Sequence, residues 1–370
     1  MFPWHLAWAT LLAVAQVAST APPSQHPQQQ PHTSTPLSAS DISQLEAKAE
    51  AGDASAQLAL GQAYEDGNGV QENDDLAVKW YRKAAEQGNA DAETELGVMY
   101  REGRGVEKSK EEALKWYRKA AQQMNAAAMF NLGAAYYNGD GIAINDSLAY
   151  AWFLAAEDAG SNAGRDAAAR SASELKEYQK IDAYLNLASM YEKGTDLRED
   201  LTAVAKWYRA AAEAGNLAAR VQLATMMVLG RGVPQDFAQA RQWCENAAKE
   251  KYSPGAFCLG LIYLQGLGVA KNPAQAAKWF NRAVEQGHVM STLYLGEMYW
   301  KGEGLDVNKE KAYSWMLVAA NAGIPKARQD VELLKKELDS RQLKRADKNA
   351  MRWERQHLMP ALRDTLNSPN

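Results

Sequence analysis

Two cysteines, Cys244 and Cys258, are the only thiols in a chain of 370 residues. They lie seven positions before and after Lys251, within a stretch that is typical of a turn between two helices. Antiparallel helices place such residues opposite each other, so the pair can form a disulfide in an oxidising compartment. Two buried thiols acting as small apolar side chains are an equal alternative, because the rotation of each helix decides whether the sulfurs meet.

A second stretch contains a serine and a lysine at a spacing known from enzymes. Ser173 and Lys176 match the Ser-x-x-Lys motif of β-lactam-binding enzymes, in which the serine is the nucleophile. The companion motifs Ser-Asp-Asn and Lys-Thr-Gly are absent from the sequence. The pair equally fits the solvent-facing side of an amphipathic helix. We therefore predict a non-catalytic protein, with an enzyme acting on β-lactams or peptidoglycan as the alternative.

The other chemistry-bearing residues give no pattern for a metal or a cofactor, and we predict neither. Of five histidines, only His288 and His357 lie beyond residue 32, and neither has a partner at the spacing of a metal motif. Glycine pairs such as Gly67 and Gly69 follow expected helices rather than strands, so they are not nucleotide-binding loops. The net charge of −4 and the pI of about 5.9 give no basic footprint for a nucleic-acid partner.

These residues lie within a repeated pattern that organises most of the chain. Three landmark residues, a leucine, a glycine and a tryptophan, return seven times at spacings of 36, 36, 55, 36, 36 and 36 residues. The glycine is Gly67 in the first copy. The leucines are Leu60, Leu96, Leu132, Leu187, Leu223, Leu259 and Leu295. The tryptophans are Trp80, Trp116, Trp152, Trp207, Trp243, Trp279 and Trp315. Seven of the 11 tryptophans thus share one repeat position, which excludes chance, and such a period indicates a stacked repeat architecture.

Each copy is predicted to be a helix–turn–helix unit. In the first copy, Leu60 and Tyr64 recur at helical spacing, and Gly67 ends the first helix because glycine takes the left-handed conformation easily. A second helix then carries Trp80 and ends near Gly88. The fourth copy departs from the pattern at its turn, where Asp196 replaces the second glycine.

The pattern LGxxYxxGxGVxxDxxxAxxWYxKAAxxG resembles that of the Sel1-like repeat (SLR) family, relatives of the tetratricopeptide repeats. The resemblance covers residues 54–323. It implies an all-α fold, a right-handed α-solenoid of seven SLR units that serves as a scaffold or adaptor for a protein or peptide partner. Some family members carry a disulfide between adjacent helices, which favours the Cys244–Cys258 bridge. Some have been described as binding or hydrolysing β-lactams, which keeps the enzyme alternative open.

The N-terminal region predicts export. Residues 1–21 are predicted to be a signal peptide, because residues 6–17 form an apolar run too short to span a bilayer and small residues follow it. The region before that run has no lysine or arginine, so the alternative is a hydrophobic tail on a cytoplasmic regulatory adaptor. Residues 22–40 are rich in proline and glutamine without charged residues, and they predict a disordered linker.

The spacing of 55 separates the third copy from the fourth. The extra residues, 163–181, predict one joint helix with Leu175, Tyr178 and Ile181 on one face. Repeats 1–3 are assigned to residues 41–162 and repeats 4–7 to residues 182–324. The joint either divides the array into two sub-arrays or is an insertion in one continuous superhelix.

Residues 325–370 predict C-terminal capping helices and a tail. A cap is needed because the last repeat of a solenoid would otherwise expose an apolar face. Val331, Leu334 and Leu338 recur at helical spacing and are predicted to cover that face.

The first helices of the later copies carry apolar residues where the first two copies carry charged ones. At the position of Glu65, for example, the fifth to seventh copies have Val228, Leu264 and Trp300. An apolar strip at positions that tolerate polar residues is a candidate interaction site. The predicted partner-binding residues are Tyr137, Val228, Leu229, Leu261, Leu264 and Trp300. The alternative is that these side chains fill gaps between turns of the solenoid or lie under the cap.

From these features we predict a monomeric, exported scaffold without a transmembrane segment in the mature chain. A peptide or protein segment is expected to lie along the curved helical surface. The expected location is periplasmic or secreted, in a bacterial envelope.

Overall fold

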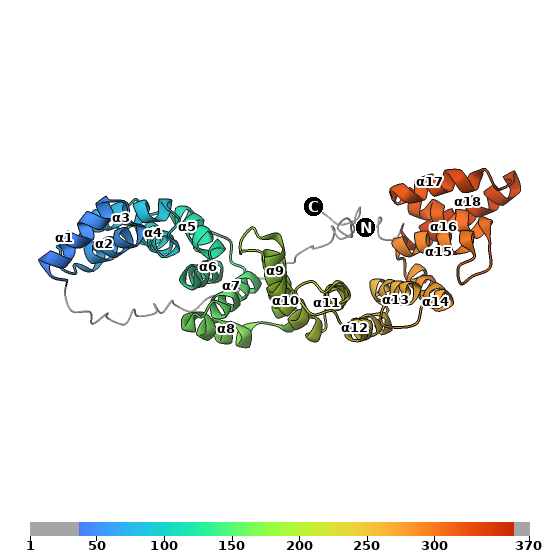
Figure 1. The fold of residues 1–370 in the computed structure, drawn as a ribbon, viewed down its shortest axis with the longest axis horizontal. Helices are drawn as coiled ribbons and strands as arrows, with labels where there is room; N and C mark the ends of the chain where they lie inside the picture. Colours follow the sequence, from blue (N-terminus) through green and yellow to red (C-terminus); the bar gives the residue numbers. More distant parts are fainter. Residues whose placement is uncertain (1–36, 359–370) are drawn as a thin grey trace.

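A computed structural model describes residues 37–358, which form eighteen helices and no strand. Helices that follow each other in sequence pack side by side, and together they form a long curved array from α1 at one end to α17 and α18 at the other (Figure 1). The prediction of an all-α solenoid is therefore confirmed. The predicted signal peptide at 1–21 and most of the predicted linker at 22–40 lie outside the described residues.

Each of the seven copies contributes one antiparallel pair of helices. The first helices are α2 (Ala54–Asp66), α4 (Ala90–Glu102), α6 (Ala126–Asn138), α9 (Glu177–Lys193), α11 (Leu217–Leu229), α13 (Ser253–Gln265) and α15 (Val289–Lys301). The second helices are α3 (Asp74–Glu86), α5 (Lys110–Gln122), α7 (Asp146–Asp158), α10 (Leu201–Glu213), α12 (Phe237–Lys249), α14 (Pro273–Glu285) and α16 (Lys309–Asn321). Four helices lie outside these pairs: α1 (Ala39–Glu50), α8 (Asn162–Glu174), α17 (Pro325–Lys335) and α18 (Ser340–His357).

Capping residues explain why the helices begin and end where they do. In four copies an aspartate or asparagine before the first helix accepts a hydrogen bond from a backbone N–H of the first turn, as a helix N-cap does. These residues are Asp53, Asn89, Asn125 and Asn216. Every first helix ends at a glycine with a positive φ, as the repeat pattern predicts. These glycines are Gly67, Gly103, Gly139, Gly194, Gly230, Gly266 and Gly302.

In five of the seven copies the two helices approach closely at the glycine that follows the landmark leucine, whereas Ala188 and Ala224 occupy this position in the fourth and fifth copies. In the second copy Leu96 is fully buried, and Gly97 faces the ring of Tyr117, which is 1% exposed. A Cβ at Gly97 would lie 2.6 Å from Cε1 of Tyr117, closer than van der Waals contact allows. The same arrangement brings Gly133 against Phe153 and Gly260 against Phe280. Glycine is therefore required by helix packing here, rather than by the backbone conformation.

The prediction of a single joint helix over residues 163–181 is wrong. Helix α8 ends at Glu174 and α9 begins at Glu177, with Leu175 and Lys176 in extended conformations between them. The break has a packing cause. Helix α8 docks on α7 through Gly164, where an added Cβ would lie 2.7 Å from the Cβ of Ala156. Helix α9 also packs on α7, and one straight rod cannot place both segments against the same helix.

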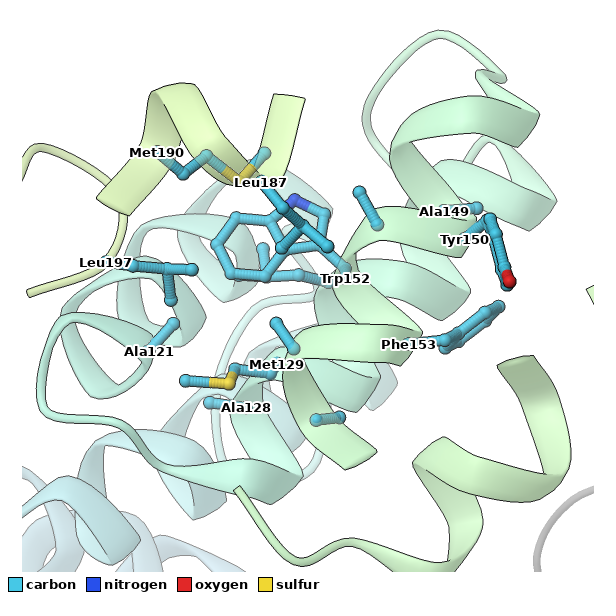
Figure 2. Packing of buried hydrophobic residues seen from close by; sticks show 14 of the residues in the cluster. Ala121, Ala128, Met129, Ala149, Tyr150, Trp152, Phe153, Leu187, Met190 and Leu197 are labelled. Atoms are coloured by element: carbon cyan, nitrogen blue, oxygen red, sulfur yellow. The ribbon is translucent and has the colours of Figure 1, made fainter. Parts of the chain in front are cut away.

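The hydrophobic core continues through the region of irregular spacing. One cluster of buried side chains extends from Ala113 in α5 to Trp207 in α10 and includes Trp152 of α7 and Leu187 of α9. Leu187 and Met190 of α9 lie beside the indole of Trp152 (Figure 2). Helix α8 is thus an insertion beside a continuous core, rather than a spacer between two separate cores.

Helices outside the repeats cover both ends of the array. At the N-terminal end, α1 buries Ile42 and Ala49. At the other end, α17 buries Val331 and Leu334, and Leu338 packs against the same cluster. Helix α18 buries Trp353, whose indole N–H donates a hydrogen bond to the carbonyl of Val284. These contacts close the apolar surfaces that a terminal repeat would otherwise expose.

We predict that Gly97→Ala destabilises the protein by about 1–3 kcal/mol, the usual cost of an extra methyl group in a packed core. The reason is the overlap with the buried Tyr117 ring. The midpoint of urea unfolding, followed by circular dichroism, measures the change. Ser55→Ala on the exposed side of α2 is the control and is expected to leave the midpoint unchanged. Equal midpoints for Gly97→Ala and the wild type would show that the close approach is dispensable.

Candidate partner-binding surface and the cysteine pair

The six residues predicted to bind a partner lie on four first helices, with different exposures. Leu229, at the end of α11, is 47% exposed and is the most accessible of them. Leu261 on α13 is 9% exposed, so little of its side chain is open to a partner. Tyr137, Val228, Leu264 and Trp300 are half-buried.

The half-buried members of this set each contact a core cluster. Val228 packs against the cluster around α11 and α12, Leu264 against that of α13 and α14, and Trp300 against that of α15 and α16. Tyr137 stands apart on α6, where its hydroxyl donates a hydrogen bond to Glu174 of α8 over 3.3 Å. The structure thus brings parts of Val228, Leu229, Leu264 and Trp300 to the surface but does not join all six side chains into one exposed strip.

The same face of the first two copies carries a network of charges. The guanidinium of Arg104 pairs with Glu65 at 2.7 Å and with Asp74 at 2.8 Å, and the hydroxyl of Tyr81 donates to Glu65. Next to it, burial, followed by the charge of Glu65 and other nearby carboxylates, raises the pKa of Glu95 to about 7. Sequence reasoning identified Glu65 as charged but missed Glu95, since the proximity of these carboxylates depends on how neighbouring first helices stack.

Cys244 and Cys258 are joined by a disulfide between α12 and α13, with their Cα atoms 6.0 Å apart. Helix rotation, which the sequence leaves open, turns both sulfurs toward the shared interface. Cys244 is fully buried within the cluster that both helices share. The bridge therefore links the second helix of the fifth copy to the first helix of the sixth.

Ser173 and Lys176 do not form a catalytic pair in the structure. Ser173 lies in the last turn of α8, and its hydroxyl donates a hydrogen bond to the carbonyl of Arg170 over 2.6 Å. Lys176 lies beyond the helix break, as the residue that precedes α9. Both side chains are exposed. This geometry supports the interpretation of two surface residues, since the helix on which the motif depends ends between them.

His288, the histidine within the repeats, is half-buried at the start of α15. Its ring packs on Phe257 at 4.6 Å between ring centroids, and its Nδ1 lies 2.9 Å from the hydroxyl of Ser291. Burial lowers the pKa of His288 to about 4.

Across residues 37–358, no group of three or more histidine, cysteine or acidic side chains is arranged to hold a metal ion. None of the helices in this range is long and apolar enough to cross a membrane.

Stacked helix pairs, small residues at each close approach and a cap at each end define a helical-repeat solenoid protein. Comparison with known families then gives seven matches to the Sel1 repeat, and the chain belongs to the Sel1 repeat family. The matched residues are 54–89, 90–123, 126–161, 181–216, 217–252, 254–288 and 289–324. Sel1 repeat proteins are generally non-catalytic scaffolds for protein interactions.

Several solved structures from bacteria are similar to this chain. A Sel1 repeat protein from Oxalobacter formigenes is 30% identical, with 80% of each chain covered and a TM-score of 0.39. A protective antigen of uropathogenic Escherichia coli with an SLR fold is 23% identical over 89% of this chain and 98% of that chain, with a TM-score of 0.28. Immunity protein Pa5087 from Pseudomonas aeruginosa is 16% identical over 77% of this chain and 83% of that chain, with a TM-score of 0.28. Among curated proteins, none matches the chain.

We predict that His288 makes stability depend on pH. Its pKa of about 4 in the folded protein lies below that of an unfolded histidine, about 6.5, so the unfolded state binds the proton more readily. The stability that His288 contributes is therefore complete above about pH 6.5 and is lost as the pH falls toward 4. In His288→Asn, which restores the N-cap residue of other copies, this part of the pH dependence should disappear.

Thermal unfolding temperatures at pH 7 and pH 5 measure the effect. The difference between the two temperatures should be smaller for His288→Asn than for the wild type. His357→Asn is the control, because it removes a second half-buried histidine, on α18, and leaves His288 in place, so it should keep the wild-type difference. An unchanged difference in His288→Asn would exclude His288 as the cause.

Proposed function

We propose that this chain is an exported adaptor that binds a peptide or protein segment along its first helices. The observation that carries the proposal is the uninterrupted array of seven first helices, which continues past α8 without a break in the core. Such an array presents one long surface on which an extended segment can make many small contacts. Family membership supports the scaffold role, since Sel1 repeat proteins generally act through protein interactions.

The partner surface is proposed to centre on Leu229. This leucine is 47% exposed at the end of α11, although the solvent-facing positions of a helix are usually polar. Val228 precedes it on α11, and the half-buried Leu264 and Trp300 occupy in the next two copies the position that Val228 has in the fifth. Their inner sides pack on the core, so a partner would contact rigid apolar surfaces and lose little conformational entropy in the complex.

Two features support export to a bacterial envelope. The first is the short apolar run near the N-terminus, followed by small residues and an uncharged segment. The second is the disulfide between Cys244 and Cys258, because disulfides persist in oxidising compartments such as the periplasm and are rare in the cytoplasm. The similar solved proteins come from bacteria, in agreement with this location.

We predict that Leu229→Glu abolishes capture of the partner. A carboxylate at the centre of an apolar contact must be desolvated on binding without a compensating partner, which weakens the complex. The measurement is crosslinked capture from the native host followed by mass spectrometry. Leu333→Glu on α17 is the matched control, because Leu333 is also an exposed leucine, at 49%. Glutamate at Leu264 or Trp300 is avoided, since these side chains pack on the core.

The outcomes separate the site from the function. Loss of a partner in Leu229→Glu alone, with unchanged circular dichroism, supports the adaptor and the site. Equal capture by all three proteins leaves the adaptor role and contradicts the site. Capture of no protein by the wild type contradicts the adaptor role itself.

A second prediction concerns export. Protein isolated from its native compartment should begin after residue 21 and should carry the Cys244–Cys258 bridge. Intact-mass spectrometry detects both features, because cleavage removes the signal peptide and a bridged pair reacts with an alkylating reagent only after reduction. An intact N-terminus together with two freely alkylated thiols would contradict export and favour a cytoplasmic adaptor.

A further inference from the structure

The turn between the two helices of a copy normally packs tightly on the preceding copy. In five copies the second glycine of this turn lies against the first residues of the preceding second helix, and an added Cβ would overlap them. These glycines are Gly105, Gly141, Gly232, Gly268 and Gly304, and all have positive φ. Two glycine properties, the absence of a side chain and the left-handed conformation, thus close the space between consecutive copies.

The fourth copy cannot make this contact, because Asp196 occupies the position of the glycine. Asp196 has a Cβ, and its φ is not in the left-handed region. The turn follows a different path. The carbonyl of Thr195 accepts a hydrogen bond from the side chain of Gln122 on α5, and Leu197 is fully buried near Ala121 (Figure 2). The turn is therefore anchored to the second copy.

A cavity of about 240 Å³ lies at this interface between the third and fourth copies. Its apolar lining includes Leu148 and Trp152 of α7 and Met190 of α9. Trp152 and Met190 lie next to each other in Figure 2. The cavity is smaller than the 300–1,000 Å³ typical of sites for small-molecule ligands, so its size suits a single side chain of a larger partner.

The rest of the lining is polar: it comprises Tyr136 and Thr195, together with the four side chains of Asn186, Ser189, Lys193 and Asp196. In the part of the chain that the structure describes, none of their side chains has a hydrogen-bond or ion-pair partner. Asn186 and Ser189 are half-buried, so their side chains have limited contact with water. Together the four groups provide both donors and acceptors.

The charges of this lining favour a neutral ligand. Lys193 and Asp196 contribute one positive and one negative charge, so a charged group attracted by one is repelled by the other. A neutral group that has both a donor and an acceptor can accept a hydrogen bond from Lys193 and donate one to Asp196. Among protein side chains, the carboxamides of asparagine and glutamine carry two N–H donors and a carbonyl acceptor on one small planar group.

We propose that this cavity binds the carboxamide of an asparagine or glutamine in the extended segment that the scaffold recognises. The proposal rests on the proposed function and names one anchor of its partner. Ser189 and Lys193 occupy on α9 the positions that Thr225 and Leu229 occupy on α11, so the cavity and Leu229 face the same side of neighbouring first helices. Helix α10 packs on both α9 and α11, so these two first helices belong to consecutive copies of the array. The carboxamide and an apolar residue that contacts Leu229 should therefore lie in one extended segment.

The test uses a displayed library of random octapeptides selected on the full chain. Selected peptides should contain asparagine or glutamine together with an apolar residue. They should bind Asn186→Leu about tenfold more weakly than the wild type, because leucine keeps the size of the side chain and removes its hydrogen bonds. Gln222→Leu is the matched control, since Gln222 occupies the same position on α11, and it should bind as the wild type does.

Analogues of the best peptide then test the ligand class. Replacement of its carboxamide by glutamate and by lysine should each reduce affinity about tenfold, because each introduces repulsion from one of the two lining charges. Tighter binding of either analogue would overturn the neutral-ligand assignment. Circular dichroism of each variant excludes unfolding as the cause of lost binding.

The outcomes also separate this inference from the proposed function. Peptides that bind Asn186→Leu as well as the wild type, but fail to bind Leu229→Glu, would overturn the cavity assignment and leave the adaptor function intact. A library that yields no binding peptide would count against both. Peptides that lose affinity in Asn186→Leu and keep it in Gln222→Leu support the cavity as an anchor site.

Discussion

The close approach of two helices at a glycine is the contact on which the rest of the molecule depends. At Gly97 the first helix of a copy lies directly on the ring of Tyr117, and the fully buried Leu96 beside it fills the interface. A short distance between paired helices buries the leucine and the aromatic ring together, which contributes to the hydrophobic stabilisation of the unit. Since each unit buries little alone, the array gains stability only by stacking, and insertions such as α8 are accommodated beside the stack.

The landmark residues predicted this architecture because most of them have a local physical role. Glycine at a helix end needs a left-handed conformation, and a leucine at a fixed helical position needs a buried face. The joint over residues 163–181 was predicted incorrectly because its break has no local cause in the sequence. The residues from 165 to 181 continue a helical pattern without a glycine or proline, and the break at Leu175 and Lys176 results from packing of both segments on α7. Met124 and Lys251 show that local rules also fail at helix ends, since both residues adopt a positive φ although neither is glycine.

The candidate surface was less predictable than the fold, because exposure depends on how neighbouring copies stack. Leu229 and Leu261 were assigned to the same apolar strip, yet Leu229 is 47% exposed and Leu261 is 9% exposed. Sequence comparison between copies identifies which positions vary, whereas the curvature of the array determines which of them reach solvent. The raised pKa of Glu95 has the same origin, since it results first from burial and then from the nearby carboxylate of Glu65 in the preceding copy.

A repeat protein built from identical units would present the same surface in every copy, so selective binding must use positions where the units differ. The fourth copy differs in its turn, where Asp196 replaces the glycine that closes the interface in the other copies. The fold tolerates this change because Leu197 and the hydrogen bond from Gln122 to Thr195 anchor the turn elsewhere. A residue that departs from its local sequence pattern is expected at a functional site, where other contacts compensate for the stability that is lost. The cavity beside Asp196 agrees with that expectation, because it lies where the glycine is replaced and is lined by Asn186 and Ser189.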